Sequence, residues 1–231
     1  MTPKKFLVAI LLLVTFFHRA ALAGDTNVVY STPPASSADL EAAYAKSLEI
    51  RTDSILTLLA LTDAAKSNAV HDILIAQYRA LRARDEVINA KLKSAGKEVD
   101  YLNRSEELAG AKILHDEFLA QLSAQLTPEQ IETVKDKMTY NKVKVTYDAY
   151  CAIIPNLIDA DKEKIMELLK AAREEAIDGG SAPEKSAIFQ KYKNQINDYL
   201  DAHGHDVAQA YKDWNAKHPD QANTNAVPAA R

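Results

Sequence analysis

The chain has 231 residues with 28 basic and 32 acidic side chains, so its formal net charge is −4. This acidic balance argues against nucleic acid or an anionic membrane surface as a partner. Cys151 is the only cysteine, which excludes an internal disulfide, and the fold must therefore be stabilised by its hydrophobic core.

The N-terminus has the features of a secretory signal peptide over residues 1–23. Lys4 and Lys5 precede an apolar run at 6–17, and Ala21-Leu22-Ala23 fits a cleavage site. The run is shorter than the roughly 20 residues that span a bilayer, and no later segment is apolar enough, so we expect no stable membrane insertion. We expect export to the periplasm or beyond, with cleavage near Ala23. The mature chain then keeps 25 basic and 32 acidic side chains, a net charge of −7.

Beyond the signal peptide, the sequence predicts a flexible leader at 24–36, one all-helical domain at 37–218 and a disordered tail at 219–231. The expected helices cover about 37–59, 62–95, 105–125, 128–138, 147–154, 160–178, 182–202 and 207–217. We expect an all-α fold, a single elongated bundle of about seven or eight helices. An unbroken 62–95 helix would be about 50 Å long. It would either kink or project, since a compact domain of this size has a radius of gyration of about 16 Å.

Several helix boundaries carry capping signals. Thr127 can cap the helix at 128–138, Pro128 suits its first position, and Gln130 can complete a capping box. Ser181 repeats the arrangement before 182–202. These are either ordinary helix starts or traces of a duplicated helical hairpin.

Residues 140–150 do not follow a clear helical period and contain Tyr140, Tyr147 and Tyr150. VKVTY at 143–147 alternates like a strand, but a lone strand has no partner, so we place the next helix at about 147. We interpret the segment as a binding surface. Cys151 has apolar neighbours on both sides, and we expect a buried core thiol.

The sequence points to no cofactor or metal and names no reaction. His203, His205 and Asp206 could begin a metal site, but no third ligand group has a recognisable spacing. A turn is the favoured interpretation, with Gly204 ending one helix and Asp206 capping the next. No nucleophile elbow, phosphate loop or dinucleotide fingerprint is present, so we assign no catalytic residue and leave enzyme activity open.

Polar and aromatic residues at the margins of the apolar helix stripes are the candidate ligand-binding groups. Their rings and stems could simply cover the edge of the core. Alternatively they line a cleft that suits a sugar, whose C–H faces stack on rings while its hydroxyls need polar partners. The candidates are Tyr78, Tyr140, Tyr147, Arg173, Lys193, Asn197 and Trp214.

Two family resemblances add to these patterns. LTPEQ at 126–130 matches the L-T-x-x-Q motif of Spy-type periplasmic chaperones, with imperfect echoes in LTDAAK and LIDADK. A broader resemblance, over about 40–217, is to domain-of-unknown-function family 3826, found mainly in Bacteroidota and described as sugar-binding. It is carried by DILIAQYRALRARDE, LSAQLTPEQIETVKDKMTYNKVKVTYDAYCAIIPNL, AAREEAIDGGSAPEK and FQKYKNQINDYLDAHGHDV.

The second resemblance implies export and a place in polysaccharide utilisation, and it supplies no catalytic residues. Our leading hypothesis is therefore a non-catalytic protein that binds an oligo- or polysaccharide. The alternatives are a glycan-degrading accessory enzyme and a Spy-like helical chaperone, which would require an exposed apolar concave patch.

Overall fold

The computed structural model describes residues 36–96 and 111–219. In these ranges the chain forms eight helices and no strand, which confirms the all-α fold class. The helices are α1 (Ser37–Leu59), α2 (Ala64–Ser94), α3 (Ala111–Ser123), α4 (Pro128–Met138), α5 (Lys142–Ile153), α6 (Asp159–Ala176), α7 (Ala182–Ala202) and α8 (Val207–Lys217). The expected signal peptide, nearly all of the leader and tail, and the front of the helix expected at 105–125 lie outside the described residues.

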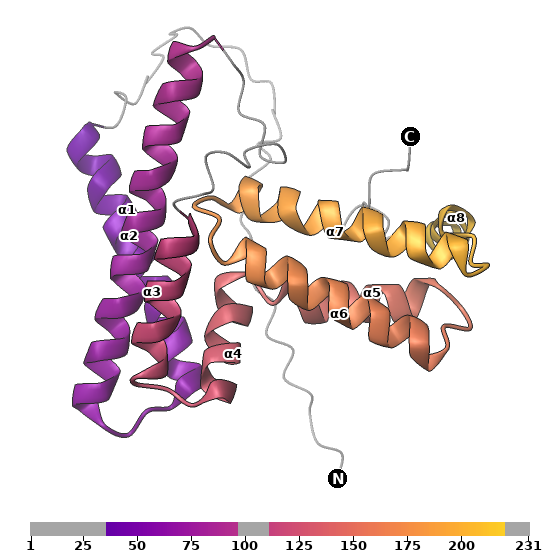
Figure 1. The fold of residues 1–231 in the computed structure, drawn as a ribbon, viewed down its shortest axis with the longest axis horizontal. Coiled ribbons are helices and arrows are strands. Elements are labelled where there is room, and N and C mark those ends of the chain that lie inside the picture. Colours follow the sequence, from indigo (N-terminus) through magenta and orange to yellow (C-terminus); the bar gives the residue numbers. More distant parts are fainter. Residues whose placement is uncertain (1–35, 97–110, 220–231) are drawn as a thin grey trace, which may run out of the picture.

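The helices form two limbs (Figure 1). In the first limb α1 and α2 make a hairpin, and α3 and α4 pack beside it. In the second limb α6 and α7 lie side by side and contact α5 and α8, and this limb projects from the side of the first. The contact between α4 and α6 joins the limbs. None of the described helices is both long enough and apolar enough to cross a membrane.

Each limb has its own hydrophobic cluster. The first is built on α1–α4 and includes Ile55, Leu74 and Phe118. The second is built on α5–α8 and includes Tyr150 and Phe189. Ile177, at the C-terminal end of α6, is fully buried in the first cluster although its helix belongs to the second limb. This side chain connects the limbs through their interiors.

The α2 helix is continuous over 31 residues, which corresponds to about 46 Å. Asp63 caps it by accepting hydrogen bonds from the backbone N–H groups of Ala65 and Lys66. Its C-terminal end extends past α3 (Figure 1). The sequence allowed either a kinked or a projecting helix, and the structure shows the projecting one.

The capping predictions are confirmed. Thr127 and Gln130 form the reciprocal capping box of α4. Ser181 accepts from the N–H of Glu184 at the start of α7, and Asp206 accepts from the N–H of Gln209 at the start of α8. Gly204, between α7 and α8, has a φ of 91°, where a side chain would be strained. The His203–Asp206 segment is thus the expected turn.

Two predictions around α5 are wrong. This helix begins at Lys142 rather than near 147, because Val143, Tyr147, Tyr150 and Ile154 recur at helical spacing on its core-facing side. Packing of that face outweighs the weak helix propensity of the β-branched residues. Cys151 is exposed, not buried. It is rotated by about 100° from Tyr150, so apolar neighbours in sequence do not share its helix face.

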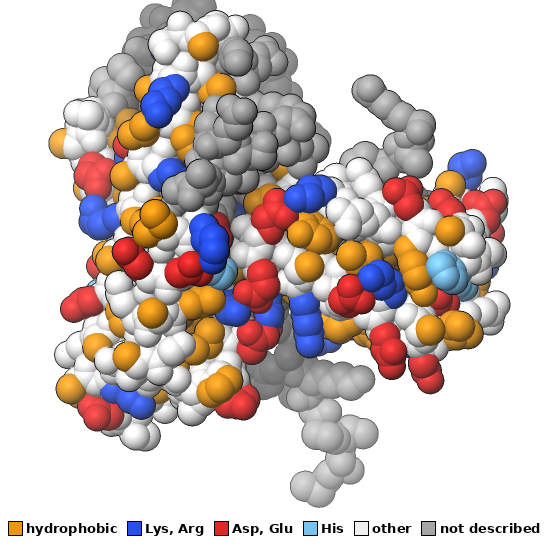
Figure 2. Space-filling view, viewed as in Figure 1, with side chains coloured by type: hydrophobic (Ala, Val, Ile, Leu, Met, Phe, Trp, Pro, Cys, Tyr) orange, Lys and Arg blue, Asp and Glu red, His pale blue; other side chains and the backbone are white. Residues whose placement is uncertain are grey.

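The surface mixes charges of both signs. Figure 2 shows acidic and basic side chains interspersed on one face, with apolar side chains between them. The large exposed apolar residues belong to several helices of both limbs; they include Leu40, Ile50, Leu58, Val87, Ile113 and Val145. These six side chains lie on α1, α2, α3 and α5.

Candidate functional site

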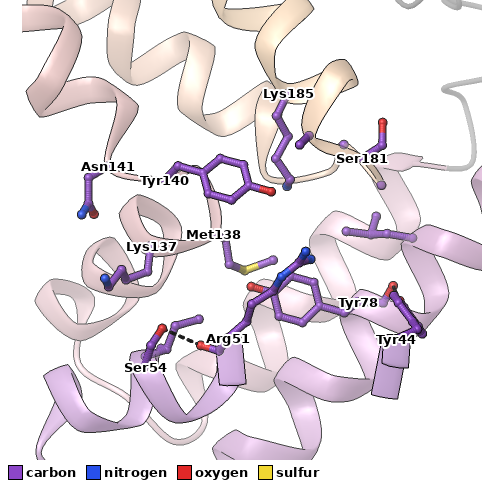
Figure 3. Close-up of a pocket in the computed structure, with 15 residues that line it drawn as sticks. Tyr44, Arg51, Ser54, Tyr78, Lys137, Met138, Tyr140, Asn141, Ser181 and Lys185 are labelled. Atoms are coloured by element: carbon purple, nitrogen blue, oxygen red, sulfur yellow. Dashed lines mark hydrogen bonds between the residues drawn. The ribbon is translucent and has the colours of Figure 1, made fainter. Parts of the chain in front are cut away.

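A cavity of about 390 Å³ lies where the limbs meet, and we call it the joint pocket (Figure 3). The α1 and α2 helices form one wall, and the end of α4 with the following corner forms another. The α6–α7 loop and the start of α7 complete it. Its lining consists of Tyr44, Arg51, Ser54, Ile55, Tyr78, Leu81, Lys137, Met138, Tyr140, Asn141, Gly179, Gly180, Ser181, Ala182 and Lys185.

Figure 3 shows how the side chains converge on this space. The guanidinium of Arg51 extends from α1 beside the ring of Tyr78 on α2. On the opposite side the hydroxyl of Tyr140 points toward the ammonium of Lys185. The pocket therefore brings together side chains that are more than 100 residues apart in the sequence.

Tyr140 occupies a strained backbone position at the corner between α4 and α5. The N–H of Tyr140 donates to the carbonyl of Lys137 at 3.1 Å, and the N–H of Asn141 donates to that of Asp136 at 2.7 Å. This is the Schellman pattern of helix ends, in which glycine usually takes the left-handed position. Here Tyr140 takes it with a φ of 61°, and Asn141 follows at 54°. A bulky left-handed residue costs about 1–2 kcal/mol, and such strain gathers at functional sites.

Tyr44 and Tyr78 form the aromatic side of the pocket. The hydroxyl of Tyr44 donates to the backbone carbonyl of Tyr78 at 3.1 Å, and the guanidinium of Arg82 lies 4.0 Å from the centre of the Tyr44 ring. Burial raises the pKa of Tyr78 to about 12, so its hydroxyl stays protonated and can donate. These contacts fix the ring of Tyr44 and leave that of Tyr78 facing the cavity.

A buried network of charges connects α2 to the start of α7 behind the pocket. Arg84 lies 2.9 Å from a carboxylate oxygen of Asp85 and 3.5 Å from one of Glu184. Glu184 also accepts from the N–H of Gly180 at 2.8 Å. A methyl group on Gly180 would overlap the Asp85 carboxylate, so this approach of loop and helix requires glycine.

Lys185 contributes both to this network and to the pocket lining. Its ammonium donates to the carbonyls of Ala176 and Ile177, at 2.9 and 3.3 Å, and so caps the end of α6. Burial lowers the pKa of Lys185 to about 8, and the charges of Arg51 and Arg84 act in the same direction. The ammonium keeps a third hydrogen, which these two carbonyls do not use.

Arg173, a predicted ligand-binding residue, has a different role. It is 4% exposed, and its guanidinium donates to Asp136, at 2.6 Å, and to Glu132, both on α4. Burial acts to lower the pKa of Arg173, but these two carboxylates raise it overall. Lys135 on α4 also pairs with Glu174 on α6 at 2.7 Å. Arg173 therefore holds α6 against α4 beside the pocket rather than lining it.

The remaining predicted residues lie in three places. Tyr78 and Tyr140 line the joint pocket, whereas Trp214 does not. Tyr147 packs against the core of the second limb. The hydroxyl of the buried Tyr150 donates to the backbone carbonyl of Lys193 and to the side-chain carbonyl of Asn197. The structure thus does not assemble the seven predicted residues into one cleft.

Trp214 lines a second, more open cavity of about 620 Å³, which we call the α8 groove. Its ring stacks on His218 with centroids 3.8 Å apart. Within the groove the side-chain amide of Gln209 donates to the carboxylate of Asp213 at 2.7 Å. The groove is formed by the end of α5, the turn after it, the loop before α8, and α8 itself. Its lining consists of Ala152, Ile153, Ile154, Pro155, Asn156, Gly204, His205, Asp206, Gln209, Ala210, Asp213, Trp214, Lys217 and His218.

Sequence reasoning missed most of the joint pocket. Tyr44, Arg51 and Ser54 lie on α1, where the sequence shows ordinary polar positions of an amphipathic helix. Lys185 resembles any exposed lysine in the first turn of a helix. A usable signal was present at Tyr140-Asn141, because the absence of glycine after α4 marks an unusual helix end.

The described residues contain no cluster of three or more His, Cys, Asp or Glu side chains placed to bind a metal ion. His205 instead contacts the carboxylate of Asp161 at 2.9 Å, and His203 contacts the backbone carbonyl of Tyr199 at 2.7 Å. Both histidines thus have local structural partners.

An eight-helix protein with a polar, tyrosine-lined pocket between two limbs is the class that this architecture defines. The chain belongs to the family described as Protein of unknown function (DUF3826), whose model matches residues 45–219. The matched region includes nearly all of both limbs and every pocket-lining residue except Tyr44. The search of curated proteins finds no match.

Proposed function

We propose that this protein binds an oligosaccharide in the joint pocket and does not cleave it. The observation that carries the proposal is the meeting of three tyrosines with serine, asparagine, arginine and lysine side chains around one cavity. Aromatic faces suit the C–H faces of sugar rings, and the polar heads suit their hydroxyl groups. A volume of about 390 Å³ is within the usual range of small-molecule sites.

The composition of the lining favours binding over hydrolysis. Most glycoside hydrolases use two carboxyl groups on either side of the scissile bond. No aspartate or glutamate is among the residues that line the joint pocket. The pocket therefore offers a sugar contacts but no acid–base pair of that kind.

We place this activity in an exported protein of polysaccharide utilisation. The signal-peptide features of residues 1–23 support export. The chaperone alternative has weaker support, because the large exposed apolar side chains are spread over several helices of both limbs. A hydrolase with two catalytic carboxyl groups would need those groups elsewhere.

Isothermal titration with a panel of plant and host oligosaccharides tests the proposal. We expect at least one to bind, and Tyr140→Gly to weaken that binding about tenfold through loss of the ring. Tyr140 is 45% exposed and its backbone favours glycine, so the variant should remain folded. Absence of binding by the folded wild-type protein to the whole panel would overturn the proposal.

Trp214→Ala is the matched control, since it removes an aromatic ring from the α8 groove instead. We expect this variant to bind as the wild type does. If Trp214→Ala abolishes binding while Tyr140→Gly preserves it, the joint pocket is not the site.

A further inference from the structure

All charged side chains that line the joint pocket are positive. Its lining includes three cationic side chains, Arg51, Lys137 and Lys185, and no aspartate or glutamate. The protein as a whole is acidic, with 32 acidic against 28 basic side chains. A purely neutral ligand would not require this local excess of positive charge.

Carboxylates on the elements around the pocket have partners outside its lining. Asp178, whose charge also acts on Lys185, lies 3.0 Å from His115. Glu132 and Asp136 pair with Arg173, and Asp85 and Glu184 pair with Arg84. By contrast, Arg51 and Lys137 form no ion pair within the ranges that the structure describes. Their charges are therefore available to a ligand.

Arg51 and Lys185 are close enough to influence each other. The charge of Arg51 is among the influences that lower the pKa of Lys185. Figure 3 shows the Arg51 guanidinium and the Lys185 ammonium on two sides of the same space. Two like charges that face one cavity repel each other, and an anion between them relieves that repulsion.

We propose that the joint pocket selects sugars that carry an oxyanion group, either a carboxylate or a sulfate ester. This inference rests on the proposed function and specifies the class of its ligand. The planar guanidinium of Arg51 suits bidentate contact with an oxyanion, and Lys137 adds a second positive charge. The tyrosine rings then hold the sugar ring that carries the group.

Titration with three matched oligosaccharides tests this selectivity. The probes are galacturonate oligomers for the carboxylate, sulfated galactose oligomers for the ester, and neutral galactose oligomers of equal length. We expect one of the charged probes to bind at least about tenfold more tightly than the neutral one, because hydrogen bonds between charged groups are stronger than those between neutral groups. The better charged probe identifies the source of the oxyanion, and its affinity should fall as salt is added.

The Arg51→Gln variant tests whether Arg51 is responsible for the preference for charged probes. Arg51 is exposed and forms no ion pair in the described ranges, so the variant should fold. We expect it to weaken binding of the charged probe about tenfold or more and that of the neutral probe much less, because glutamine can still contact a hydroxyl group. Arg79→Gln is the control, because Arg79 is exposed, pairs with Glu41 and lies outside the pocket lining. Lys185 is unsuitable for substitution here because it also caps α6.

The outcomes separate this inference from the proposed function. Equal affinity for neutral and charged probes would overturn the selectivity and leave glycan binding intact. An Arg51→Gln variant with an undiminished preference for charge would overturn the role given to Arg51. Failure of every oligosaccharide would overturn both. Binding of inorganic sulfate as tight as that of the sulfated sugar would show a simple anion site, and would overturn the sugar component.

Discussion

The joint pocket and the α8 groove are both cavities that contain aromatic side chains, but they differ in the charges of the residues that line them. The α8 groove is lined by two acidic side chains, Asp206 and Asp213, and one basic side chain, Lys217. In the joint pocket Arg51 and Lys137 have no ionic partner in the described part of the chain. The groove is the larger of the two, at about 620 against 390 Å³.

Neither size nor aromatic content sets the joint pocket apart as the candidate site, because the α8 groove is larger and also contains an aromatic ring. The joint pocket is distinguished by a lining with three cationic side chains and no aspartate or glutamate, and by the bulky Tyr140 at a left-handed position. Such features cost stability, and they persist where the surrounding structure enforces them. The predictions below perturb this side of the comparison and leave the α8 groove intact.

The largest effect concerns the pH dependence of stability through Lys185. Its pKa is depressed from 10.5 to about 8 on folding, so the unfolded chain binds more protons between these values and stability rises with pH. Asp178, Glu184, Arg51 and Arg84 are the charged groups that act on it. Relative to Lys185→Met, the wild type should gain up to roughly 3 kcal/mol between pH 8 and 10.5.

Denaturant unfolding of both proteins at several pH values between 7 and 10.5 measures this gain. Charge-selective ligand binding should change in the opposite direction, weakening as Lys185 loses its proton. A constant difference in unfolding free energy across the range would contradict the prediction.

Arg173→Met should lower the unfolding free energy by about 2–3 kcal/mol, because it removes the buried partner of Glu132 and Asp136 between α4 and α6. Those carboxylates are half exposed and can be hydrated, which limits the loss. Lys191→Met is the control. It breaks a more exposed pair with Glu175 and should cost less than about 1 kcal/mol. Similar costs for the two variants in urea unfolding would refute the proposed role of Arg173.

Gly180→Ala should cost about 1–3 kcal/mol, because the added methyl group overlaps the carboxylate of Asp85. The same substitution in an Asp85→Ala background should cost clearly less, since the obstructing group is gone. A double-mutant cycle measured by thermal unfolding gives the coupling. Simple additivity of the two costs would show that the close approach is not the cause.

The smallest expected effect has the opposite sign. Tyr140→Gly should leave stability unchanged or raise it by about 1 kcal/mol, because glycine accepts a φ of 61° without strain. Tyr140→Ala keeps the strain and serves as the comparison. If both variants are equally stable in urea unfolding, backbone strain at this corner is negligible.

The sequence predicts the helices well where caps and apolar period agree. The predicted bounds of α1, α4, α7 and α8 coincide with those of the structure. It fails at α5, because β-branched residues and tyrosines hide the spacing from Val143 to Ile154 on which the helix packs. The exposed position of Cys151 was missed for a related reason, since its apolar sequence neighbours lie on a different face of the helix.

The site was less predictable than the fold. Tyr78 and Tyr140 were selected from the sequence and line the joint pocket, but Arg51 and Lys185 were not selected. The positions of these two depend on how α6 docks against α4, which is determined by long-range pairs such as Arg173 with Asp136. Periodicity along one helix carries no information on such a junction.

The burial of Ile177 bears on how the molecule unfolds. Because this residue of the second limb completes the core of the first, detaching α6 would open a void among Leu74, Phe118 and their neighbours. The two limbs should then lose structure together, in one cooperative transition whose calorimetric and van't Hoff enthalpies agree. Because Ile177 of the second limb is part of the core of the first, we expect the two limbs to behave as a single thermodynamic unit.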